Sequence, residues 1–170
     1  MSDPMHRAAP TANEDDWKTI ARIVGKARIA FLTTVGDNGA LHSRPLALPD
    51  EEFEGSISFL VQAGSEKVDD SALTPQVNVA VQDGDDYLSL AGTASVTRDQ
   101  ARIEALWSPF AEAWFPEGRE DPSIRVLTVA VDTAEYWVSD ATVFRKVATT
   151  ARAMVGHGTP DTGENRAVDL

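Results

Sequence analysis

Short runs of β-branched, aliphatic and aromatic residues recur at close spacing and constrain the fold of this chain more than any other feature. Turn-forming residues separate the runs, as GDNG (Gly36–Gly39) does after the first of them. Gly92 marks a possible bulge inside a longer run. This spacing predicts a mainly β protein, an antiparallel barrel with peripheral helices rather than a doubly wound sheet. The predicted strands cover residues 29–35, 40–48, 56–62, 76–82, 87–97, 124–131 and 134–140.

Helices are predicted between some of the strands. One is expected to begin after Asn13, which can cap it, and to end at Gly25, because the apolar residues between them follow the spacing i, i+3, i+4, i+7. A second is expected over Arg98–Trp107. Ser65 is a plausible N-cap of a short helix that Pro75 would stop.

The chain of 170 residues suits a single domain, expected over residues 13–155. Residues 1–12 read as a flexible tail, and residues 156–170 as an extended polar tail. Residues 141–154 fit either a strand or a helix. The chain lacks cysteine, a long apolar run and the apolar core of a signal peptide, which together favour a cytoplasmic protein without disulfides or membrane spans.

The charge balance limits the partners. Lys and Arg number 15 and Asp and Glu 27, so the net charge is -12, a field that repels nucleic acid and anionic membranes. A bound anion would therefore need a local cluster of donors. The three histidines are far apart in the sequence, so we expect no histidine-rich metal site.

Familiar catalytic and nucleotide-binding motifs are missing from the sequence. It contains no G-x-G-x-x-G after the first strand, no Walker loop and no G-x-S-x-G elbow. The run Asp50-Glu51-Glu52 is most simply a solvated loop. What remains is a pair of basic residues beside strand edges, Arg44 and Lys67.

The run ALHSRPLAL places Arg44 directly before Pro45 in the middle of a predicted strand. Proline cannot donate to a sheet ladder, so it belongs at an edge, a strand end or a bulge. We therefore predict that this strand lies at an edge and faces a bound ligand rather than another strand.

A second candidate is Ser65 with Lys67. If Ser65 caps a helix, the hydroxyl, the Lys67 ammonium and the free N–H groups of the first turn would form a phosphate site. The alternative is a solvated lysine on a short surface helix. Trp114 and Trp137 also have two interpretations, since each could pack in a core or interface or lie against a planar ligand.

Five segments in order give the chain a resemblance to a known family: FLTTVGDNGALHSRPLAL, FLVQAGSEKV, VNVAVQDGDDYLSLAG, EALWSPFAEAWFPEG and AEYWVSD. The order resembles the pyridoxamine 5′-phosphate oxidase-like, flavin-binding split-barrel proteins, and within them the general stress protein 26 group. It extends from about Asp16 to the end of the chain. The resemblance implies a homodimer of six-stranded antiparallel Greek-key barrels, with FMN or sometimes FAD at the interface.

The resemblance also implies roles for the basic segments. Arg44 would contact the flavin or its phosphate, and Pro45 and Leu46 would run along the isoalloxazine ring. Ser65 and Lys67 match the family's phosphate-binding G-S-x-K pattern.

Further positions follow from the same resemblance. Val61 stands where threonine is common, so it would contribute a backbone contact. Ser89 matches a position that lines the site, and Trp137 matches a tryptophan near the ring that can come from the second subunit. Trp114 is expected on the substrate side. No catalytic residue is identified.

The expected activity is that of a flavin-dependent oxidoreductase acting on an unidentified small molecule. The R-x-H motif of true pyridoxamine phosphate oxidases is missing from VSDATVFRKV after Trp137, so vitamin B6 oxidation is not expected. Two alternatives stay open, a non-catalytic flavin-binding or storage protein of the stress response and a reductase that uses deazaflavin F420. The net charge of -12 disfavours the acidic tail of F420.

Overall fold

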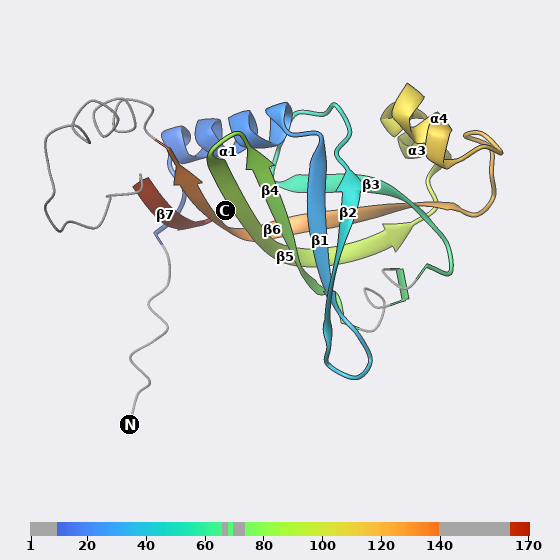
Figure 1. The fold of residues 1–170 in the computed structure, drawn as a ribbon, viewed down its shortest axis with the longest axis horizontal. Helices are drawn as coiled ribbons and strands as arrows, with labels where there is room; N and C mark the ends of the chain where they lie inside the picture. Colours follow the sequence, from blue (N-terminus) through green and yellow to red (C-terminus); the bar gives the residue numbers. More distant parts are fainter. Residues whose placement is uncertain (1–9, 66–67, 70–73, 140–163) are drawn as a thin grey trace, which may run out of the picture.

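The computed structural model describes residues 10–65, 68–69, 74–139 and 164–170. It is a mainly β structure with helices at the periphery, as predicted (Figure 1). The elements are α1 Glu14–Lys26, β1 Ile29–Val35, β2 Leu41–Ala47, β3 Ser56–Gln62, β4 Gln76–Asp83, β5 Asp86–Thr97, α3 Gln100–Leu106, α4 Pro109–Trp114, β6 Ile124–Val138 and β7 Glu164–Asp169.

The strands form one antiparallel sheet in the order β2-β1-β4-β5-β6-β3, and β7 pairs with β6. The prediction of separate strands over 124–131 and 134–140 is wrong, because β6 runs unbroken from Ile124 to Val138. One edge of β6 pairs with β5 along most of its length. The other edge pairs first with β3 and then with β7. Partners on both edges satisfy most of the backbone of β6, so no turn is needed between the two halves.

Parts of the two expected tails belong to the sheet. Within the expected extended tail 156–170, residues 164–169 form β7, whose Val168 is fully buried. Within the expected flexible tail, Ala12 N donates to Asp169 O at 2.8 Å and Asp169 N donates to Pro10 O at 3.0 Å. Both segments therefore pair with each other at one end of the sheet. The ambiguous residues 141–154 lie outside the described part of the chain.

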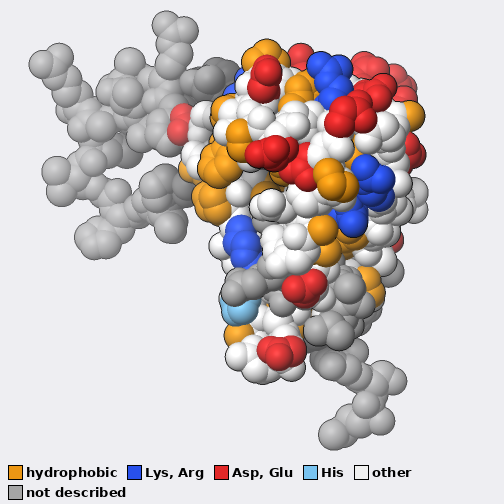
Figure 2. All heavy atoms as spheres, turned by 90° about the vertical axis from the view of Figure 1, so that its right-hand side faces the viewer, with side chains coloured by type: hydrophobic (Ala, Val, Ile, Leu, Met, Phe, Trp, Pro, Cys, Tyr) orange, Lys and Arg blue, Asp and Glu red, His pale blue; other side chains and the backbone are white. Residues whose placement is uncertain are grey.

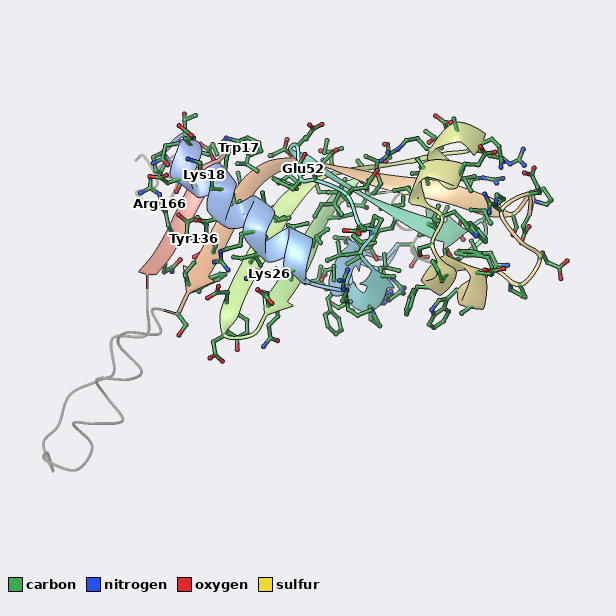
Figure 3. All side chains as sticks on the ribbon, turned by 90° about the horizontal axis from the view of Figure 1, so that it is seen from above. Trp17, Lys18, Lys26, Glu52, Tyr136 and Arg166 are labelled. Carbon is green, nitrogen blue, oxygen red and sulfur yellow. The ribbon has the colours of Figure 1, made fainter. Side chains whose placement is uncertain are left out.

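Helix α1 lies across the sheet and buries Ile20, Ile23 and Val24 (Figures 1 and 3). Asn13 caps the helix as predicted. The expected end at Gly25 is wrong by one residue, because the helix continues to Lys26 and the N–H of Ala27 closes the last turn on Ile23 O at 3.1 Å.

Helices α3 and α4 lie at the end of the molecule away from β7 (Figure 1). Helix α3 is shorter than the predicted Arg98–Trp107, since Asp99 caps its N-terminus. Helix α4, for which no helix was predicted, is capped by Ser108 and has Pro109 in its first turn, a pattern that marks a helix start.

The predicted bulge at Gly92 is confirmed by a register shift between Ala91 and Gly92. A Cβ at Gly92 would lie 2.1 Å from Ala130 O, so only glycine allows β6 to approach so closely. The close approach keeps β5 and β6 paired on both sides of the bulge.

Candidate functional site

The pairing of β1 with β2 distributes the predicted site residues between the two faces of the sheet. Residues directly opposed in an antiparallel pair point to the same face. Arg44 opposes Leu32, which is fully buried, so the Arg44 side chain lies on the inner face of the sheet. Pro45 opposes Phe31, which is 51% exposed, so it lies on the outer face. In the described part of the chain β2 pairs with β1 alone, which gives Pro45 the edge position predicted for it.

On the inner face, the contacts of Arg44 include Thr34 and His42. Its Nη1 donates to Thr34 Oγ1 at 3.0 Å, and its Nη2 lies 3.1 Å from His42 Nδ1. A guanidinium has no acceptor, so His42 Nδ1 must accept. Figure 2 shows histidine and Lys or Arg side chains at the surface on this end of the molecule. Arg44 is half-buried, so the cation is both oriented and partly accessible.

The outer face carries polar pairs between apolar side chains. Thr33 Oγ1 and Ser43 Oγ are 2.7 Å apart across β1 and β2. Asn78 on β4 donates through Nδ2 to Ser89 Oγ on β5 at 2.8 Å. Ser89 thus shares the outer face with Pro45, with β1 and β4 lying between their strands.

Trp137 also belongs to the outer face, at the far end of β6. It opposes Tyr87 of β5 and Asn165 of β7. In the sheet order, β1, β4 and β5 separate its strand from β2. Within one chain Trp137 and Arg44 are therefore not neighbours, and a shared site would need a contribution from a second copy.

Ser65 lies just after β3 and shapes a turn there. Its hydroxyl donates to Gln62 O at 2.7 Å, and its carbonyl oxygen accepts from Val68 N at 2.8 Å and Asp69 N at 3.2 Å. Residues 68–69 are helical, in line with the short helix expected here. Lys67 lies outside the described residues, so the Ser65–Lys67 phosphate site stays a prediction.

The other predicted residues have contrasting surroundings. Val61 is buried in the core, and Leu46 is partly buried against it, so neither side chain presents much surface. Trp114 on α4 is 70% exposed, and its ring centroid lies 6.3 Å from that of Phe110. Helix α4 and β7 lie at opposite ends of the molecule, so Trp114 and Trp137 of one chain do not meet (Figure 1).

A buried carboxylate that the sequence analysis missed ties the chain ends together. Asp16 is 1% exposed, and its Oδ1 accepts from Tyr136 Oη and from Arg166 Nε, both at 2.7 Å. Its Oδ2 accepts from Asn13 N at 2.9 Å, which completes a capping box. Figure 3 shows Tyr136 and Arg166 beside the N-terminal part of α1. We name Asp16, Tyr136 and Arg166 the clasp.

The clasp has a defined ionisation. Burial raises the pKa of Asp16, but hydrogen bonds from the Asn13 backbone, the Tyr136 hydroxyl and Arg166, together with the charge of Arg166, outweigh burial and leave the pKa below its ordinary value. Asn followed three residues later by Asp before an apolar run was the available sequence signal for the capping box. No local pattern indicates the contacts with Tyr136 and Arg166.

A second missed network corrects the interpretation of Asp50-Glu51-Glu52 as a solvated loop. The Glu51 carboxylate accepts from Arg102 Nη1 at 2.7 Å and Nη2 at 3.0 Å, and Nη2 also lies 3.0 Å from Ser58 Oγ. The hydrogen bonds from Arg102 to Glu51 raise the pKa of Arg102, and they outweigh burial, which lowers it. The network ties α3 to the loop before β3.

A hollow beside this network is too small for a cofactor. It has space for about 10 Å³ and is lined by Val24, Leu48, Pro49, Glu51, Glu52, Phe53, Ser56, Ile57 and Ser58, none of them a predicted site residue. Among the described residues, no three His, Asp or Glu side chains gather so that they could hold a metal ion. None of the helices that the structure describes is long and apolar enough to cross a membrane.

Comparison with solved structures defines the class of fold. A crystal structure of a candidate general stress protein 26 from Jannaschia sp. CCS1 superimposes with a TM-score of 0.74 at 24% identity, covering 93% of this chain and 100% of that one. The general stress FMN/FAD-binding protein of Xanthomonas citri gives a TM-score of 0.67 at 20% identity over 86% and 98% of the two chains. The fold is therefore a split barrel, with the strand β7 in addition to the six strands that the family resemblance implies.

Sequence comparison then gives the family. The model of the family described as pyridoxamine 5′-phosphate oxidase-like matches residues 15–161, so the chain belongs to that family. Protein bli-3 of Neurospora crassa is 32% identical over 129 aligned residues, and the match covers 69% of this chain. The matched region spans 61% of the length of bli-3. The family resemblance noted in the sequence is confirmed.

Proposed function

We propose that this protein binds a flavin, FMN before FAD, along the free edge of β2, and uses it as an oxidoreductase acting on a small molecule. The observation that carries the proposal is the arrangement of β2. This strand lies at the edge of the described sheet, presents the oriented Arg44 on one face and presents Pro45 on the other. A ligand crossing that edge can reach both faces.

The residues present fit the two parts of a flavin cofactor. Arg44 is fixed by Thr34 and His42, and charge-assisted hydrogen bonds from a guanidinium to a phosphate are among the stronger polar contacts. In the proposal Arg44, Ser65 and Lys67 hold the phosphate. The ring lies along Pro45 and Leu46, with the backbone of Val61 and the side chains of Ser89 and Trp137 as further contacts.

The proposal includes a homodimer. The outer face exposes several large apolar side chains, which come from β1, β2 and β5. An apolar sheet face of this kind is typical of an interface. A second copy would cover it, and would bring its Trp137 toward the flavin and its Trp114 toward the substrate. The residues in question are Ile29, Phe31, Leu41 and Tyr87.

When bound, the flavin ring would accept and donate a hydride or electrons. The protein would bind the cofactor, orient it and exclude water from it. The substrate and electron donor are unidentified. A non-catalytic flavin-binding stress protein is the second candidate, favoured by the lack of an R-x-H substrate clamp in VSDATVFRKV. F420 is less favoured by the net charge of -12, and the cytoplasmic location is part of the proposal.

The test begins with the visible absorption spectrum of gently purified protein, followed by chromatography of any released chromophore. The proposal predicts a flavin spectrum, released FMN or FAD, and bleaching by NADH or NADPH with turnover on an added oxidant. Bound flavin without reduction or turnover would favour the non-catalytic protein. A colourless protein that takes up no added FMN would overturn flavin binding.

A further inference from the structure

The hydrogen bond between Asn78 and Ser89 fixes how both side chains can meet a ligand. Asn78 Nδ2 donates to Ser89 Oγ at 2.8 Å. A hydroxyl that accepts from one partner keeps its own hydrogen for another acceptor. Asn78 Oδ1 has no hydrogen-bond partner among the described residues, and neither side chain makes a further polar contact there. On the outer face the pair therefore keeps Asn78 Oδ1 as an acceptor, with the Ser89 O–H and the second Nδ2 hydrogen as donors.

The surroundings of the pair suit a flat ligand. Across β4 and β5, Asn78 opposes Ala91 and Ala80 opposes Ser89. Two methyl groups thus flank the polar pair and let a planar ring approach the backbone. Phe31 opposes Ala80 from β1, so an aromatic side chain borders the patch.

The charge around the patch argues against an anionic group. Glu135 on β6 opposes Ser89 on the same face. The polar pair is itself neutral, and a carboxylate beside it disfavours a phosphate. A neutral donor beside a neutral acceptor matches instead the C=O and N–H of an imide. Proteins recognise nucleic-acid bases in the same way, through the donors and acceptors on their edges.

We propose that Asn78 and Ser89 recognise the imide edge of the flavin pyrimidine ring. Ser89 donates to a ring carbonyl oxygen, and Asn78 Oδ1 accepts from the ring N3–H. The inference rests on the proposed flavin binding and adds Asn78, a residue that the sequence analysis did not select. It also assigns Ser89 the role of donor.

The test titrates flavin-free full-length protein with FMN and with N3-methyl-FMN, following the fluorescence of the flavin. The wild type should bind N3-methyl-FMN at least about 10-fold more weakly than FMN, because the methyl group removes the N–H donor. Asn78→Leu should bind FMN about 10-fold more weakly and should no longer distinguish the two ligands. Ser89→Ala should weaken both ligands alike.

The matched control is Thr33→Val, which removes a hydroxyl that lies opposite Asn78 on the same face. It should leave the discrimination between the two flavins unchanged. Should Asn78→Leu fail to fold, as judged by circular dichroism, Asn78→Thr takes its place. The proposal is overturned if wild type binds both flavins equally, or if an Asn78 variant keeps the wild-type preference. Failure of the wild type to bind FMN at all would instead overturn the proposed function and this inference with it.

Discussion

The clasp and the outer face of the sheet differ in which groups they bury. The clasp buries a charged group, and the outer face exposes apolar side chains. In the clasp, the Asp16 carboxylate is buried and accepts hydrogen bonds from three protein groups. On the outer face, large apolar side chains such as Phe31 are exposed, and Asn78 and Ser89 retain hydrogen-bonding capacity. The clasp therefore serves the fold, whereas the outer face is suited to groups from outside this chain.

The two regions meet within one strand. Tyr136 and Trp137 are neighbours on β6, and alternation along a strand sends them to opposite faces. Tyr136 is buried and bonded to Asp16, whereas Trp137 lies on the outer face between Tyr87 and Asn165. The clasp thus fixes the position of the strand end that carries a predicted flavin contact.

Removing the clasp carboxylate should have the largest effect. Asp16→Ala is expected to lower the free energy of unfolding by about 2–4 kcal/mol, because it leaves Arg166 without this carboxylate and removes half of the capping box. Urea denaturation followed by circular dichroism measures the change. Asp15→Ala, in the same turn with a side chain that is 93% exposed, is the control and should change stability by less than about 0.5 kcal/mol. Equal effects of the two substitutions would show that the clasp does not stabilise the fold.

Arg44→Ala should affect flavin binding rather than the stability of the fold. It is expected to weaken FMN binding by about 1.5–3 kcal/mol, roughly 10- to 150-fold, since it removes a charge-assisted contact. Lys67→Ala should act in the same direction. Isothermal titration calorimetry gives the dissociation constants. The control is Arg22→Ala, which breaks an ion pair of 2.8 Å with Asp86 away from β2. Wild-type affinity in both Arg44→Ala and Lys67→Ala would remove these residues from the site.

The dimer is tested on the outer face. Phe31→Ser should raise the dissociation constant of the dimer about 10-fold, because half-burial of a phenyl ring contributes about 1–1.5 kcal/mol. Analytical ultracentrifugation over a concentration series measures it. Lys18→Ala, on α1 and with a side chain that is 66% exposed, is the control for removing exposed surface away from the outer face. If the two variants dissociate alike, or neither does, the outer face of β1 is not the interface.

The smallest expected effect is on how the free energy of unfolding depends on pH. Because the pKa of Asp16 is lowered in the folded state, its stabilisation is present above the ordinary aspartate range near pH 4 and is lost as the pH falls through the lowered folded value. The contribution of this one group to the slope is at most about 1.4 kcal/mol per pH unit. Unfolding free energies from pH 6 to pH 3 should fall less steeply for Asp16→Asn than for the wild type. Parallel curves would contradict the lowered pKa.

The same contrast explains what could be predicted from the sequence. Strands with clean alternation or strong turn signals, such as Ile29–Val35 and Ser56–Gln62, were predicted with their observed bounds. Strand β7 was missed because its inward-facing Val168 follows charged and polar residues, and its pairing with β6 is a long-range contact.

The candidate site divides in the same way. Arg44 and Pro45 could be found because a cation and a proline in mid-strand conflict with ordinary pairing. In its local sequence Asn78 is an ordinary strand residue, and Asp16 is an ordinary residue of a helix cap. Their hydrogen-bond partners, Ser89 and Tyr136, are distant in the sequence and come close only in the folded chain.

A crystal structure of the protein grown with excess FMN tests the central claim most directly. The account predicts flavin at a dimer interface, with its phosphate on the Arg44 guanidinium and its ring against Pro45 on the edge of β2. Flavin bound away from β2, or no bound flavin at saturating concentration, would contradict it.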